Sequence, residues 1–199
     1  MSNLKVSQKS NTNNLVKIGL LSAIGYILMF ISVPLPFLFP DFLKLDISDL
    51  PVLLGTVSMG SVSGILISFL KNLLQFITGM SSNGGIGELA NFLIGSSLVV
   101  GMSFTFKIKN KKNLIKSLVI GVIFMTFMGC LTNYFLILPF YETIMPIDAV
   151  IGLASEINPI IKNKIDFIIW MIIPFNILKG LMISSVTVLI YEKIKSVLN

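Results

Sequence analysis

The sequence predicts an all-α integral membrane protein in which six transmembrane helices form one bundle. Of its 199 residues, 54% are hydrophobic and only 12% are charged, whereas a soluble domain averages about 25% charged residues. The mean hydropathy is +0.92, and long apolar runs recur along the chain, as is typical of membrane-spanning segments. We therefore expect no soluble domain within these residues.

Six apolar runs define the predicted helices. The polar segment 1–15 is expected to be a disordered cytoplasmic N-terminus, and residues 16–199 are expected to form the membrane domain. The connection 140–165 mixes polar and apolar residues and has room for a short surface helix. The predicted helices cover residues 16–33, 50–59, 62–77, 88–106, 118–139 and 167–191.

The positions of the lysines predict that both chain ends lie on the inner side of the membrane, because cytoplasmic loops are enriched in lysine and arginine. In this orientation ten lysines lie inside and three lie in outer loops, while Glu192 is the one inner acid of nine. The inner lysines are Lys5, Lys9, Lys17, Lys107, Lys109, Lys111, Lys112, Lys116, Lys193 and Lys195, and the outer ones are Lys44, Lys162 and Lys164. This asymmetry explains the net charge of +6 without a nucleic-acid partner.

The connection between the first two helices, residues 34–51, is unusual. It is too apolar for a free loop and too rich in proline and aspartate for a span, so we expect it to fold back onto the bundle as a re-entrant-like outer lid. Apolar and acidic residues alternate over 45–49, which fits a short extended piece. Ser48 or Asp49 followed by Pro51 also suits the start of a helix, and both interpretations can hold at once.

Polar side chains inside the spans are the candidate binding residues. Asn176 and Lys179 are three residues apart and share one helix face, and a lysine near the middle of a span costs about 2.5–3.5 kcal/mol on insertion scales. Asn91 and Asn133 add amides from two other spans. An amide offers two donors and two acceptor lone pairs, so such a set can bind a neutral molecule through hydrogen bonds. For one asparagine alone, bonding between helices is the simpler interpretation; for Asn133, Asn176 and Lys179 beneath an apolar lid, we favour a binding site.

The sequence offers little for catalysis or energy coupling. It has no histidine, no arginine and the single cysteine Cys130, which argues against a nucleophile–base pair, a disulfide within the chain and a metal site. No nucleotide-binding motif is present, and no predicted span has an acid in its interior for proton coupling. Lys71, also within a span, is expected to pair with Asp49 or Glu88 or to lie at the edge of a gap in the bundle. These features indicate a binding protein that depends on a separate motor, and not an enzyme.

Five motifs carry a family resemblance. They are Leu45–Pro51 (LDISDLP), Lys71–Leu74 (KNLL), Ala90–Leu93 (ANFL), Asn133–Pro139 (NYFLILP) and Pro174–Gly180 (PFNILKG). In this order and spacing they resemble the riboflavin-specific S components (RibU type) of energy-coupling-factor (ECF) transporters, over essentially the whole chain after about residue 15. The resemblance implies a protein of the bacterial plasma membrane, without a cofactor, that captures riboflavin from outside. It would then join a transmembrane coupling subunit and two cytoplasmic ATPases.

The resemblance also assigns roles to individual residues. Gly19 and Ala23, a pair of small residues on the first helix, would face the coupling subunit.

Two alternative functions remain: an S component for another vitamin or precursor, and a self-contained membrane facilitator. The apolar inner halves of the last two spans argue against a facilitator. The absence of arginine favours the free vitamin over a phosphorylated flavin. The expected ligand-binding residues are Asn133, Asn176, Lys179, Asn91, Leu45, Asp46 and Phe39.

Overall fold

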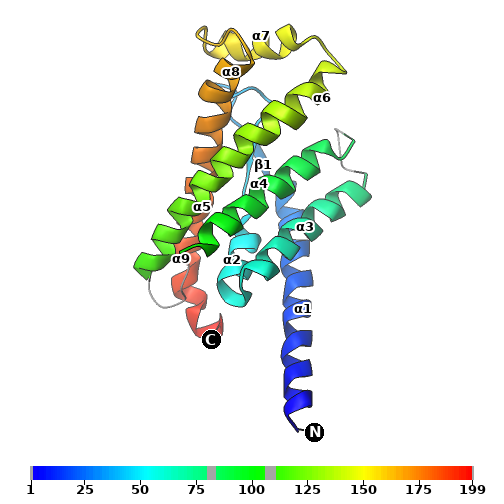
Figure 1. Ribbon diagram of the computed structural model, residues 1–199, viewed down its shortest axis with the longest axis vertical. Helices are drawn as coiled ribbons and strands as arrows, with labels where there is room; N and C mark the ends of the chain where they lie inside the picture. The colour runs from blue at the N-terminus through cyan, green and yellow to red at the C-terminus, as the bar shows by residue number, and fades with distance from the viewer. Residues whose placement is uncertain (1, 80–83, 106–110, 199) are drawn as a thin grey trace.

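The protein is a helical bundle with one small antiparallel sheet (Figure 1). This computed structural model describes residues 2–79, 84–105 and 111–198; the predicted inner residues Lys107 and Lys109 lie outside them. The two chain ends lie at the same end of the bundle, and the connection before the last helix lies at the opposite end (Figure 1).

Helix α1 spans Ser2–Met29. Its backbone is helical from Ser2 onward, so the expectation that residues 1–15 are disordered is not met in the described part. The segment 2–14 is polar but contains neither proline nor glycine, the two residues that most strongly interrupt a helix. The helix can therefore continue beyond the apolar residues, and its N-terminal part extends past the other helices (Figure 1).

The lid connection forms a two-stranded hairpin. Strand β1, Ser32–Pro34, pairs antiparallel with β2, Lys44–Asp46, with Val33 opposite Leu45. Helix α2, Leu50–Met59, starts directly after it, with Asp49 at its N-cap position and proline in its first turn. Both sequence interpretations of this segment are confirmed, although the Asp49 side chain makes no capping hydrogen bond.

The lid is held to the bundle by aromatic residues. Phe39 is only 5% exposed, and its ring meets Phe175 edge to face at 5.3 Å between centroids. Phe42 lies between Tyr141 and Phe167, at 5.6 and 6.2 Å. The expected folding of this connection back onto the bundle is therefore observed.

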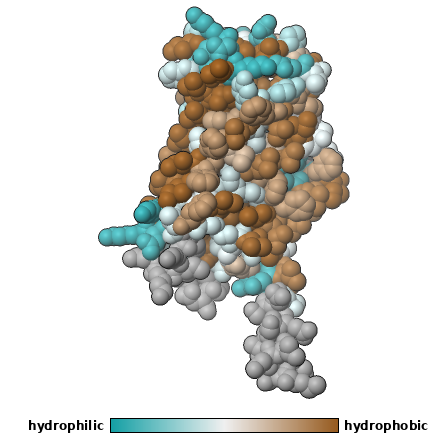
Figure 2. Space-filling model, in the orientation of Figure 1, coloured by the Kyte–Doolittle hydropathy of each residue, from teal (hydrophilic) through white to brown (hydrophobic). Residues whose placement is uncertain are grey.

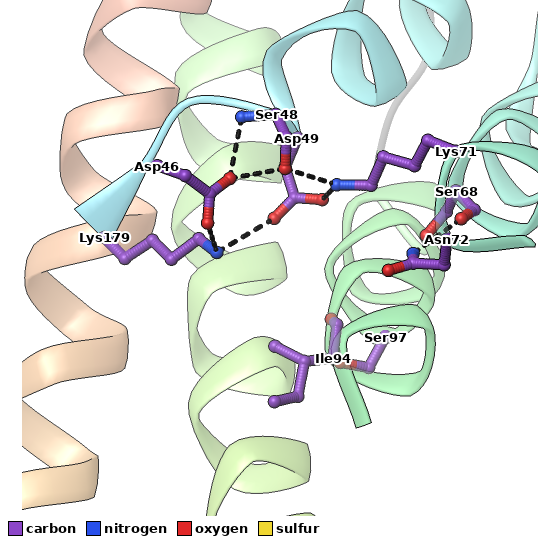
Figure 3. A network of polar contacts seen from close by, with 9 residues as sticks. All are labelled: Asp46, Ser48, Asp49, Ser68, Lys71, Asn72, Ile94, Ser97 and Lys179. Carbon is purple, nitrogen blue, oxygen red and sulfur yellow. Dashed lines mark hydrogen bonds and ion pairs between the residues drawn. The ribbon is translucent and has the colours of Figure 1, made fainter. Parts of the chain in front are cut away.

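Helices α2 and α3 are short. Helix α3 spans Ser61–Ile77 and follows α2 through Gly60, whose φ of 94° is a conformation that glycine adopts without steric cost. The ten residues of α2 extend about 15 Å, roughly half of the hydrocarbon core. The hairpin strand and the turn before α2 lie between the helices (Figure 3).

The fourth helix and two long helical rods complete the bundle. Helix α4 spans Ile86–Ser103. The first rod consists of α5, Lys111–Thr132, the π-helical segment η1, Asn133–Ile137, and α6, Leu138–Glu142. The second rod consists of α8, Lys164–Phe167, the π-helical segment η2, Ile168–Ile172, and α9, Ile173–Leu198. The expected surface helix between the rods is α7, Ile147–Ile157.

Each π-helical segment ends two residues before a proline. Pro139 follows η1, and Pro174 follows η2. Proline lacks the N–H that the carbonyl four residues earlier would accept, and its ring presses on that carbonyl. A wider turn relieves this conflict, and single π turns of this kind occur frequently at functional sites.

The surface agrees with a membrane location. Apolar side chains form a broad band around the face shown in Figure 2, with hydrophilic side chains gathered at the end that carries α7. Among the described residues, four helical stretches are long and apolar enough to cross a membrane: Thr12–Met29, Ile86–Ser103, Lys112–Glu142 and Lys164–Tyr191. Helices α2 and α3 are the two shorter apolar helices.

Candidate functional site: a polar cavity beneath the lid

A cavity of about 280 Å³ lies between the lid and helices α3, α4, α9 and the first rod. This volume is just below the range of about 300–1,000 Å³ typical of small-molecule sites. The lining includes five of the predicted ligand residues: Asp46, Asn91, Asn133, Asn176 and Lys179. The structure thus brings together side chains that lie as far as 133 positions apart in the sequence.

Gly129 organises the two most buried amides of the cavity. Its carbonyl accepts a hydrogen bond from Asn133 Nδ2 at 2.8 Å. A Cβ atom at Gly129 would lie only 2.6 Å from Asn176 Nδ2, so the absence of a side chain there gives the Asn176 amide its place. Asn176 Nδ2 in turn donates to the carbonyl of Ile172 at 2.9 Å.

Both amides keep hydrogen-bonding capacity for a ligand. Each uses one N–H on a carbonyl of its own helix, and within the described residues no other hydrogen bond of either amide is found. A second N–H and the Oδ1 acceptor of each therefore remain. Bonding between helices, the simpler interpretation of a single asparagine, is not what the structure shows for either residue.

Lys179 is paired with the lid. Its Nζ donates to Asp46 Oδ2 at 2.7 Å and lies 3.7 Å from Asp49 Oδ2. Burial by itself would raise the pKa of Asp46, but the charges of Lys179 and Lys71 and the hydrogen bonds from Lys179 and Ser48 outweigh it. They hold that pKa below its ordinary value of 3.8. Asp46 is therefore a carboxylate at neutral pH, and the cost of burying Lys179 is offset by a counter-charge from the lid.

A second buried pair lies beside the first (Figure 3). Lys71 Nζ lies 2.5 Å from Asp49 Oδ1 and donates to Ser48 Oγ at 2.7 Å. Ser48 donates through both its backbone N–H and its hydroxyl to Asp46 Oδ1. The two pairs thus form one network of two lysines, two aspartates and a serine, whose formal charges cancel. Of the two partners expected for Lys71, Asp49 is the one with which it forms an ion pair.

Two predicted ligand residues do not line the cavity. Phe39 packs against Phe175 in the apolar cluster beside it, and Leu45 packs against the same cluster from strand β2. Both side chains therefore hold the lid against the bundle through apolar contacts. Gly19 and Ala23 lie on an exposed face of α1, and a Cβ atom at Gly19 would have no neighbour within 4 Å.

Several cavity residues were not among those expected to bind the ligand. Gln75, Glu88 and Tyr141 add polar groups to the lining, and Phe175 adds an aromatic wall. Gln75 is recognisable in the sequence as a polar residue inside an apolar run, Glu88 as an acid at the outer end of such a run, and Tyr141 by its place two residues after Pro139. The structure therefore defines a membrane protein with a partly open cavity beneath its lid, lined by several polar side chains that can form hydrogen bonds.

Comparisons with known proteins give the family. The model of the family described as ECF transporter, substrate-specific component, matches residues 13–191. The chain is 38% identical over 195 residues to the riboflavin transporter RibU of Staphylococcus aureus (strain TCH60), covering 98% of this chain and 96% of that protein. It is 35% identical to the riboflavin transporter FmnP of Bacillus subtilis (strain 168), with 91% of each chain covered.

A solved structure agrees with these relatives. It is described as the S component of a bacterial ECF transporter, and it superposes with a TM-score of 0.74 at 36% sequence identity, covering 95% of this chain and 99% of that one. The chain belongs to the family of ECF transporter substrate-specific components. It is a membrane protein that works with an ECF module, and members of this family are transporter components and not enzymes.

Proposed function

We propose that this chain binds riboflavin at the cavity beneath its lid, on the outer side of a bacterial plasma membrane. It then delivers the vitamin together with a transmembrane coupling subunit and two ATPase subunits. The observation that carries this proposal is the cavity itself, where Asn133, Asn176 and Lys179 come together in a chain about 35–38% identical to two riboflavin transporters.

The chemistry of the lining suits the vitamin. The pyrimidine edge of the flavin ring carries carbonyls and an N–H, which complement the free Oδ1 and N–H groups of Asn133 and Asn176. Lys179 has donors beyond the one it gives to Asp46. The apolar dimethylbenzene edge suits Phe175, and the ribityl hydroxyls need scattered polar partners such as Asn91.

The charge balance of the site favours a neutral ligand. Both lysines of the network already face a carboxylate at 2.5–2.7 Å, so neither is left over for a phosphate. Lys44 and Glu88 also line the cavity and add one formal charge of each sign, so the formal charges of the lining cancel. We expect riboflavin to bind more tightly than flavin mononucleotide.

The proposed topology has six spans with both ends inside, residues 16–199 forming the membrane domain and residues 1–15 preceding it on the cytoplasmic side. It is supported by the location of both chain ends at one end of the bundle (Figure 1). Lys17, Lys112 and Lys193 belong to that end. In this orientation the cavity opens to the outside, and Gly19 and Ala23 are free to meet the coupling subunit.

Fluorescence titration of the purified protein tests the function. Riboflavin emission should be quenched with one site per chain, and flavin mononucleotide should require a higher concentration. Binding of a different vitamin with no response to riboflavin would favour the alternative S component. Uptake by cells that lack the coupling subunit would favour a self-contained facilitator.

A further inference from the structure

Lys71 is completely buried although it does not line the cavity. Its exposed fraction is 0%, as is that of its partner Asp49. Breaking such a pair by removing one partner is strongly destabilising, because the other charge stays buried without compensation. Apolar residues of similar volume would hold two helices together without this hazard, so the retention of the pair points to a positioning role.

The backbones of two glycines, on different helices, lie close against the Lys71–Asp49 pair. A Cβ atom at Gly25 of α1 would lie 3.2 Å from Lys71 Cδ and 3.3 Å from the carbonyl oxygen of Ser48. A Cβ atom at Gly95 of α4 would lie 3.0 Å from Asp49 Oδ1. The Lys71 and Asp49 side chains are thus held between two helix backbones, with little freedom to move.

A continuous chain of contacts leads from this pair to the cavity (Figure 3). Lys71 fixes Asp49 and Ser48, and Ser48 donates to Asp46 Oδ1. The other oxygen of Asp46 receives the Lys179 ammonium at 2.7 Å. Ser48 thereby sets the orientation of the Asp46 carboxylate, and that carboxylate sets where the Lys179 ammonium points in the cavity.

We propose that Lys71 is a positioning residue for ligand binding: through Asp49, Ser48 and Asp46 it fixes the segment 46–49 of the lid and thereby the ammonium of Lys179. The inference rests on the proposed function, since it concerns the same cavity. It assigns to Lys71 no contact with the ligand. Because Gly25 of α1 packs on the Lys71 side chain, the position of α1 also bears on the site.

The test compares the wild type with a paired variant, Lys71→Met/Asp49→Asn, which removes both charges and leaves none unpaired. Its matched control is Lys164→Met/Glu142→Gln, which removes an ion pair whose side chains are 35% and 36% exposed. The dissociation constant for riboflavin is measured for each, and again after adding Lys179→Met to the wild type and to the paired variant. Helix content and thermal unfolding in detergent show that each variant is folded.

The paired variant should bind riboflavin about tenfold more weakly, the effect of losing roughly one buried hydrogen bond, while the control should bind as the wild type does. With Lys179→Met already present, the paired change should cost less than about twofold, because residues acting through one another are not additive. A paired variant with wild-type affinity overturns the proposal. So does a full tenfold loss in the presence of Lys179→Met, which would mean that Lys71 acts independently of Lys179.

Hydrogen exchange of the ligand-free protein tests the placement of the lid without riboflavin. The backbone amides of residues 44–50 should exchange faster in the paired variant than in the wild type, with α5 unchanged. Equal exchange in both overturns the proposal even if riboflavin binds. If the wild type fails to quench riboflavin, the proposed function fails, and this exchange result alone decides the role of Lys71.

Discussion

Replacing Gly129 with alanine should displace the Asn176 amide and weaken riboflavin binding. The new Cβ would lie 2.6 Å from Asn176 Nδ2 and 2.8 Å from its Cγ, where ordinary contacts begin at 3.4 Å. The amide must therefore retreat by about 0.8 Å, the difference between 2.6 and 3.4 Å, which is enough to lose a well-aligned hydrogen bond. A lost buried hydrogen bond costs about 1–3 kcal/mol, so the dissociation constant should rise about five- to 150-fold.

Fluorescence quenching of riboflavin measures this change directly. Gly152→Ala in α7 is the control, because a Cβ atom there meets nothing within 4 Å and alanine is a better helix former than glycine. The control should bind as the wild type does. Adding Asn176→Ala to Gly129→Ala should cost little more, since both changes act on one amide. Wild-type affinity in a folded Gly129→Ala protein, or two fully additive losses, would refute the reasoning.

Three further predictions concern the lid network and α1. Lys179→Leu should weaken riboflavin binding by about 1–3 kcal/mol in the same titration; unchanged affinity would reduce Lys179 to a structural partner of Asp46. Gly25→Leu should weaken riboflavin binding because the new side chain collides with Lys71 and Ser48. Gly19→Leu should leave binding unchanged and reduce uptake, because it blocks the exposed face of α1. Equal effects of the two substitutions on binding and on uptake would contradict this contrast. Since the pKa of Asp46 is lowered in the folded protein, its stabilising effect is fully present above about pH 3.8 and is lost as the pH falls through the folded pKa. The difference in thermal unfolding between wild type and Asp46→Asn should therefore be constant from about pH 5 to 8 and shrink in acid; a change near pH 6 would contradict the assignment.

Much of the fold could be predicted because membrane segments are defined by long apolar runs. The extent of α2, the start of α3 within one residue and the surface helix α7 agree with the prediction. The helical start of α1 was missed, since polar composition alone does not say whether a segment without proline or glycine is helical. Neither π-helical segment was predicted, although Pro139 and Pro174 within apolar runs were visible signals.

The site could be predicted only in part because hydrogen-bond partners depend on three-dimensional placement. Asn133, Asn176 and Lys179 were recognisable as polar residues inside apolar spans, and they do meet at one cavity. The pairing of Lys179 with Asp46 joins residues 133 positions apart and has no local signature. Asp46 and Asp49 lie outside the apolar runs of the sequence, and they reach the interior on the lid segment that precedes α2.

The ion pairs between the lid and the helices constrain how the cavity can open. Lys71 and Lys179 belong to membrane helices, and the lid supplies the carboxylates that neutralise them. Withdrawing the segment 46–49 would leave buried charges unpaired, at about 3–5 kcal/mol for a broken pair. Separating Phe39 from Phe175 forfeits about 0.5–1.5 kcal/mol for the ring contact and uncovers apolar area. A bound flavin ring can cover that area again, whereas a neutral ligand cannot replace a lost counter-charge.

The less costly movement is therefore at the aromatic part of the lid, residues 35–43, where Phe37 is already 93% exposed. In such a movement the acidic segment 46–49 stays in place as a fixed wall of the cavity, and only the aromatic cover moves. A ligand could then reach Asn133 and Asn176 while the charges of the network remain paired. The connection thus divides into an aromatic cover and an acidic anchor, because breaking the ion pairs and separating the aromatic contacts have different consequences. This division explains why one loop carries both aromatic and acidic residues.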